Sequence, residues 1–94
     1  MNKLNYLSPW IREAEIMEIN AIRLCANGNV NSGFWALQDA ITTYKKTLWG
    51  LSTYPITKEE RKVAKEINRS LERITGISTY LFNMIQQKEH SLSI

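Results

Sequence analysis

The feature that most constrains this chain is an uninterrupted apolar repeat in its centre. Six side chains recur there at alternating intervals of three and four residues: Phe34, Leu37, Ile41, Tyr44, Leu48 and Leu51. This spacing puts all six on one face of an α-helix and does not fit the two-residue alternation of a strand. Asn31-Ser32 offers an N-cap, and Pro55 ends the pattern because proline disfavours helical geometry in the residue before it. We therefore predict a helix over residues 33–51.

The segment before this helix carries a second helical pattern. Ser8-Pro9 predicts a helix start, since proline is well suited to the first helical position. Five side chains then follow the same three-and-four spacing: Trp10, Ala14, Met17, Ala21 and Leu24. Asn27-Gly28-Asn29 contains the residue types that end helices, so this first helix should end near Ala26.

The last segment begins with a capping box, in which Thr57 and Glu60 each accept a hydrogen bond from the other residue's backbone N–H. An apolar stripe follows, interrupted only by a serine: Val63, Ile67, Leu71, Ile74, Ser78, Leu81 and Ile85. Because the stripe keeps its helical phase across Gly76, we predict one long helix over residues 58–87. The alternative is a break near Gly76, which gives four helices.

Together these patterns predict an all-α fold, an antiparallel three-helix bundle with a long third helix. We expect a single domain over residues 1–94, with flexible termini at residues 1–7 and 89–94. No stretch approaches the roughly 20 apolar residues of a membrane span, and the start lacks a signal-peptide pattern. Since the lone Cys25 has no internal disulfide partner, we expect a cytoplasmic protein with no membrane association.

The residue types that carry chemistry are scarce. The chain has one His, one Cys and one Asp, too few for a catalytic triad within one copy. Zinc-ligand clusters and phosphate-binding glycine patterns are also lacking, so we predict no enzyme, no metal and no cofactor. Glu13, Glu15 and Glu18 are interpreted as solvated surface, and Cys25 as a small core residue.

One face of the third helix gathers basic side chains opposite its apolar stripe. At about 100° per residue the members of this basic face are Lys58, Lys62, Lys65, Arg69 and Arg73. Tyr80 extends it with a stacking surface, the combination that nucleic-acid binders use. An acidic protein partner would fit the same face. The alternative interpretation is an ordinary solvent-exposed helix surface without a binding role, because Glu59, Glu66 and Glu72 dilute the positive charge.

Several apolar residues fall outside the predicted core stripes. Trp35, Thr42 and Trp49 lie roughly opposite the apolar stripe of the second helix, and Ile16 and Ile19 lie off that of the first. Tryptophan is enriched where protein interfaces concentrate their binding energy. These four apolar side chains are covered by the chain itself, by a fourth helix, or by a partner, including a second copy of the chain.

A short stretch of the central helix resembles a repeat family. Residues 39–48, followed by Pro55, are similar to the second helix of a tetratricopeptide repeat, over about a tenth of the chain. In that family the glycine ending the preceding helix stands closer to the alanine than Gly28 does to Ala40. There is also no second copy at the expected period. The helix pattern is faintly similar to microtubule-interacting-and-trafficking bundles and to helical secretion chaperones, all of which hold partner helices.

The leading hypothesis is a non-catalytic protein-binding bundle of the adaptor, chaperone or inhibitor type. It would dock another protein, or a second copy of itself, against Trp35, Trp49, Ile16 and Ile19. The alternative is a nucleic-acid-binding protein that uses the basic face of the third helix. The composition, rich in Asn, Ile, Lys and Ser, resembles that of bacterial and phage proteins.

Overall fold

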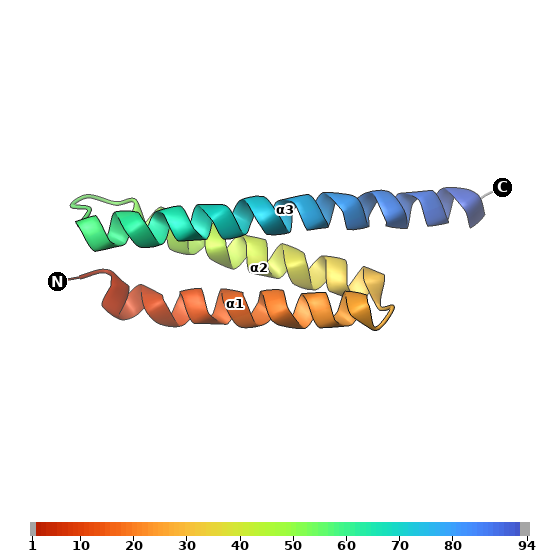
Figure 1. Cartoon of the computed structure of the whole chain (residues 1–94), viewed down its shortest axis with the longest axis horizontal. Coiled ribbons are helices and arrows are strands. Elements are labelled where there is room, and N and C mark those ends of the chain that lie inside the picture. The colour runs from red at the N-terminus through yellow and green to blue at the C-terminus, as the bar shows by residue number, and fades with distance from the viewer. Residues whose placement is uncertain (1, 93–94) are drawn as a thin grey trace.

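The computed structural model describes residues 2–92, with side chains described as far as Glu89. These residues form three helices and no strand: α1 (Leu4–Ala26), α2 (Val30–Leu51) and α3 (Lys58–Leu92). α1 and α3 run in the same direction and α2 runs against both, packing on α1 along one side and on α3 along the other (Figure 1). The predicted all-α, antiparallel three-helix bundle is confirmed. The molecule is elongated, 58 × 19 × 14 Å.

α1 begins earlier than the sequence predicted. Its first residue is Leu4, whose N–H donates to Asn2 Oδ1 at 3.0 Å, so the start predicted at Ser8-Pro9 is wrong. Pro9 lies inside the helix, and Ser8 Oγ donates to Leu4 O at 2.5 Å one turn back. Within the predicted flexible segment 1–7, residues 4–7 are therefore helical. The flexibility of that segment stays a prediction.

The turn between α1 and α2 is a Schellman motif. Gly28 has φ 87°, a left-handed conformation that glycine adopts without steric cost. The N–H of Gly28 donates to Cys25 O at 3.1 Å, and the N–H of Asn29 donates to Leu24 O at 2.8 Å. The predicted end of the first helix at Ala26 is confirmed. α2 then starts at Val30 with Asn29 as its N-cap residue, so the N-cap predicted at Asn31-Ser32 is wrong and both of those residues lie in the first turn of the helix.

α3 is continuous through Gly76, so the four-helix alternative is wrong. A Cβ placed on Gly76 would meet nothing within 4 Å, which shows that no close packing there demands a break. The predicted capping box is present: Thr57 N–H donates to Glu60 Oε1 at 2.8 Å, and Glu60 N–H donates to Thr57 Oγ1 at 3.1 Å. α3 continues to Leu92, beyond the predicted end near Gln87, and overhangs the α1–α2 turn (Figure 1). The tail predicted at residues 89–94 is thus helical through Leu92, and residues 93–94 lie outside the described residues.

The core runs along the centre of the bundle and takes residues from all three helices. Its buried apolar members are Ala14, Ala21, Leu37, Ala40, Ile41, Tyr44, Leu51, Ile67, Ile74 and Leu81. Ser78, which interrupts the stripe of α3, is buried and accepts a hydrogen bond from Gln38 Nε2. The prediction that Trp10 belongs to the core is wrong, since this side chain is 53% exposed. Counting from Leu7 instead of Trp10, the core face of α1 passes through Ile11 and Ala14.

Candidate interaction surfaces

The middle of the bundle holds a polar cluster that sequence analysis missed. Glu18 lies in the core face of α1 and is buried, so its interpretation as solvated surface is wrong. Tyr44 from α2 donates its hydroxyl to Glu18 Oε1 at 3.1 Å, and Arg73 from α3 donates to Glu18 Oε2 at 2.7 Å. Both carboxylate oxygens therefore have a partner, which is the condition for keeping a charge in a protein interior.

The pKa of Tyr44 reflects the buried and negatively charged surroundings of this cluster. Burial, reinforced by the neighbouring charge of Glu18, raises the pKa of Tyr44 to about 12. The phenol thus stays protonated and acts as a hydrogen-bond donor throughout the ordinary pH range. A carboxylate hydrogen-bonded to both a phenol and a guanidinium ties three helices together. We interpret the cluster as structural.

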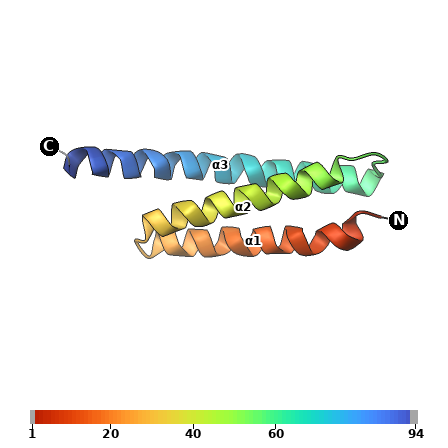
Figure 2. The same cartoon turned by 180° about the vertical axis from the view of Figure 1, so that it is seen from behind.

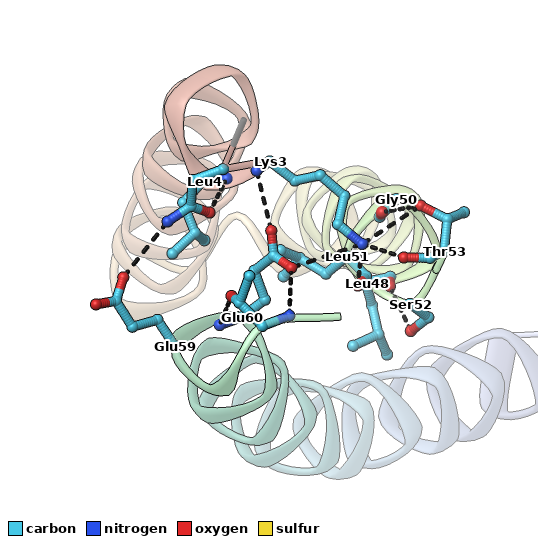
Figure 3. Close-up of polar contacts among 11 residues, drawn as sticks. Lys3, Leu4, Leu48, Gly50, Leu51, Ser52, Thr53, Glu59 and Glu60 are labelled. Carbon is cyan, nitrogen blue, oxygen red and sulfur yellow. Dashed lines mark hydrogen bonds and ion pairs between the residues drawn. The ribbon is translucent and has the colours of Figure 1, made fainter. Parts of the chain in front are cut away.

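A second polar cluster closes the end of the bundle where α1 and α3 begin (Figure 3). Besides capping α3, the buried Glu60 accepts the N–H of Lys3 on Oε2 at 2.9 Å, and Lys3 Nζ lies 3.7 Å from Oε1. Lys3 Nζ also donates to Leu51 O at 3.1 Å and to Thr53 O, which satisfies carbonyls at the end of α2. Hydrogen bonding from the Thr57 N–H, with that of Lys3 and its charge, holds the pKa of Glu60 below 4.5 against the opposing effect of burial.

The outward face of α2 carries the two predicted tryptophans. Trp35 is 66% exposed and Trp49 is 76% exposed, and Thr42 between them is exposed as well. The side chains with which α2 packs on α1 and α3 point the other way, and Figure 2 shows α2 running between the other two helices on the near side. We call Trp35, Thr42 and Trp49, with the exposed Asp39, Lys45 and Lys46 beside them, the tryptophan face.

Trp35 contacts another aromatic ring, whereas Trp49 has no such contact among the described residues. The Trp35 ring meets Phe34 edge-on at 5.3 Å between centroids, and Phe34 lies 6.0 Å from Phe82 of α3. Trp35 is thus braced against the α2–α3 interface. At the opposite end of α2, Trp10 of α1 borders a shallow pocket together with Lys46, so a third tryptophan lies at the edge of this face. A stripe drawn through Leu7, Ile11 and Ala14 would have placed Trp10 outside the core face of α1.

The other predicted pair lies elsewhere. Ile16 and Ile19 are 52% and 50% exposed on α1, and helical geometry turns them away from the α1 side chains that pack on α2. The structure therefore does not join the four predicted partner-binding residues into one surface. It places two of them on α1 and two on the tryptophan face of α2.

One residue of the predicted basic face of α3 also forms an ion pair with α1. Lys58, Lys62, Lys65 and Arg69 are exposed, and Arg73, whose side chain is 56% exposed, pairs with Glu18 of α1. Tyr80 is 65% exposed and lies eleven residues beyond Arg69, about 16 Å along the helix. The four remaining cations and the tyrosine therefore belong to separate parts of α3.

Within residues 2–89 no group of three His, Cys, Asp or Glu side chains is placed to hold a metal ion. Cys25 is half-buried at the α1–α2 contact, and His90 lies outside the described side chains. No helix in the described part of the chain is both long and apolar enough to cross a membrane.

A pocket of about 310 Å³ lies under the overhang of α3. Its lining includes Val30, Met84 and Ile85, together with Lys88 and Glu89.

No protein-family model matches this sequence. The comparisons with curated proteins and with solved structures likewise found no match.

Proposed function

We propose that this chain is a non-catalytic protein-binding bundle that works in the cytoplasm as an adaptor, chaperone or inhibitor. The observation that carries the proposal is the exposure of Trp35 and Trp49, 66% and 76%, on one face of a regular helix. Leaving two indole rings in water forgoes a large hydrophobic gain, because each tryptophan can bury 150–250 Å². Such residues in an exposed apolar patch are typical of a surface that becomes buried when a partner binds.

The form of the rest of the molecule supports binding over catalysis. The two carboxylates with buried side chains, Glu18 and Glu60, have hydrogen-bond partners on both oxygens. Among the described side chains, no buried polar side-chain atom is left without a partner. The polar groups of the interior are therefore occupied in holding the helices together, whereas large apolar side chains stay exposed on the outer faces of α1 and α2.

Site-specific photo-crosslinking in the source cell tests this proposal. A photo-reactive residue would be placed at one of two exposed test positions: Thr42, at the centre of the tryptophan face, or Arg23, beside Ile16 and Ile19. Thr79, on the exposed side of α3, is the control position. We expect a crosslinked protein from Thr42, from Arg23 or from both, and none from Thr79. The Thr42 product should disappear when Trp35 and Trp49 are both changed to alanine. Absence of a product from both test positions would contradict the proposal.

A second candidate is nucleic-acid binding by α3, favoured by the four exposed cations Lys58, Lys62, Lys65 and Arg69. A contact of this kind would weaken steeply with salt, because each neutralised phosphate releases counterions. Titration of labelled single-stranded RNA and duplex DNA at low salt tests it, with a Lys62→Glu, Lys65→Glu variant as the matched control. Equal binding by the variant, or no binding by the natural chain, would remove this candidate.

A further inference from the structure

We propose that the tryptophan face binds a second copy of this chain, with two α2 helices antiparallel across a two-fold axis at Thr42. This inference rests on the proposed function, because it names the protein that the exposed tryptophans bind. Its first support is spacing. Trp35 lies seven residues before Thr42 and Trp49 lies seven residues after it, about 10 Å along the helix in each direction.

That spacing makes the face complementary to itself. When two helices run antiparallel about an axis at Thr42, residue n of one copy lies opposite residue 84 − n of the other. Trp35 then meets Trp49 of the second copy, and the same pair forms again on the other side of the axis. Thr42, the smallest side chain in the row, faces its own symmetry mate, so the two backbones can approach closely there.

Charge supports the same arrangement. Asp39 and Lys46 lie on one flank of the tryptophan row, within roughly 60° of Thr42 around the helix, and Lys45 lies on the opposite flank. In an antiparallel pair each flank faces the same flank of the other copy, so Asp39 lies beside the second copy's Lys46, twice per dimer. Both side chains are exposed, and neither belongs to an ion pair among the described residues.

Charge also disfavours the competing orientation. In a parallel pair opposite flanks face each other, so Lys46 of one copy would lie beside the second copy's Lys45. Like charges placed together at an interface oppose association, and this selects one orientation over another. In the antiparallel pair the two Lys45 side chains stay about six residues apart along the helices, roughly 9 Å.

The area available indicates a reversible dimer. Four exposed tryptophans, at 150–250 Å² for each side chain and about two-thirds exposed, bring roughly 400–700 Å² to the contact. A standard interface buries 1,200–2,000 Å², so the flanking side chains must supply the remainder. Trp35 is already braced by Phe34 at 5.3 Å, which lowers the entropy lost when its ring is covered.

Thiol crosslinking tests the position of the axis. In a Cys25→Ser background, Thr42→Cys would place two thiols across the axis, whereas Thr79→Cys on α3 serves as the control. We expect oxidation to yield a covalent dimer from Thr42→Cys much faster than from Thr79→Cys. Changing Trp35 and Trp49 to alanine in the same background should remove that difference. Equal rates for the two positions would overturn the inference.

Light scattering on the natural chain gives an independent measurement that needs no cysteine variant. We expect a monomer–dimer equilibrium, with the dissociation constant raised at least about thirtyfold by Trp35→Ala with Trp49→Ala. Asp39→Lys and Lys46→Asp should each weaken the dimer roughly tenfold, and the two changes together should restore it. A chain that stays monomeric at all concentrations, or a double charge swap that fails to restore pairing, would contradict the proposal.

The two proposals fail in different ways. If the natural chain is monomeric and the photo-reactive residue at Thr42 captures a different protein, the two-fold pairing is wrong and the protein-binding function stands. If the captured product has twice the mass of the chain, both stand. If no product forms at Thr42 or Arg23, both fall.

Discussion

The two sides of α2 meet their neighbours in different ways. Toward α1 the contact uses small residues, and a Cβ on Gly33 would come within 3.1 Å of Ala21 O and 3.2 Å of the Cys25 backbone nitrogen. α3, in contrast, contributes large side chains to the core: Ile67, Ile74 and Leu81. One interface is stabilised by how closely two backbones approach, and the other by how much apolar volume is buried between them.

This difference predicts that the two interfaces respond oppositely to changes in side-chain volume. The α2–α3 interface should be damaged most by removing volume, because a truncated side chain leaves a cavity. The α1–α2 interface should be damaged by adding volume, because two close backbones have no room for it. The polar clusters at Glu60 and Glu18 then hold α3 to the α1–α2 hairpin, since they provide specific contacts between α1 and α3.

The largest effect is expected from Ile74→Ala. Ile74 is fully buried, so its truncation should lower the free energy of unfolding by about 3 kcal/mol. Urea denaturation followed by circular dichroism measures this loss. Ile77→Ala, at a half-buried position one turn further along α3, is the matched control and should cost less. Equal losses at the two positions would show that the α2–α3 core is not packed around Ile74.

Gly33→Ala should come next, and it tests the close contact between α1 and α2. Alanine favours a helix over glycine by about 1 kcal/mol, so an open site would gain stability. Here we expect a net loss of about 1–2 kcal/mol, because the added methyl group is forced against the α1 backbone. The same denaturation experiment measures it. A gain in stability would mean that the two helices separate at little cost.

The third prediction concerns the polar cluster that joins the start of α1 to α3. The pKa of Glu60 is lower in the folded state than its ordinary value of 4.5. The ionised carboxylate therefore stabilises the fold at pH values above 4.5, and this contribution is lost as the pH falls through the folded-state pKa. Thermal unfolding at pH 7 and at pH 3 should show a fall in Tm that is smaller in Glu60→Gln. The exposed Glu72→Gln serves as the control and should keep the fall of the natural chain.

Most of the fold could be predicted from the sequence because its signals are local. The apolar repeat of α2, the capping box at Thr57 and Glu60, and the unbroken phase across Gly76 each depend on residues a few positions apart. The start of α1 could not be predicted in this way. It depends in part on Glu60, 57 residues further along the chain, which accepts the N–H of Lys3.

In the candidate surfaces, too, features with local signals could be predicted, whereas features that depend on contacts between helices could not. Helical period alone placed Trp35 and Trp49 on the outside of α2, where the structure exposes them. Period could not reveal that Glu18 is buried, because its burial depends on Tyr44 and Arg73 from two other helices. For the same reason the ion pair of Arg73 could not be predicted, since its partner Glu18 was interpreted as solvated surface.

The smallest effect is expected at Gly76, an exposed glycine within α3, and it contrasts with that at the buried Gly33 of α2. Gly76→Ala places its methyl group in open space on α3, so the only effect is the helix propensity of alanine. We expect the free energy of unfolding to rise by up to about 1 kcal/mol, opposite in sign to Gly33→Ala, although the substitution is the same. Denaturation of the two single variants and of the double variant measures both changes. Because a methyl group at Gly76 would meet no atom within 4 Å, the two substitutions share no contact, and the double variant should show the sum of the two effects. A loss of stability in Gly76→Ala would mean that α3 needs a flexible point there after all.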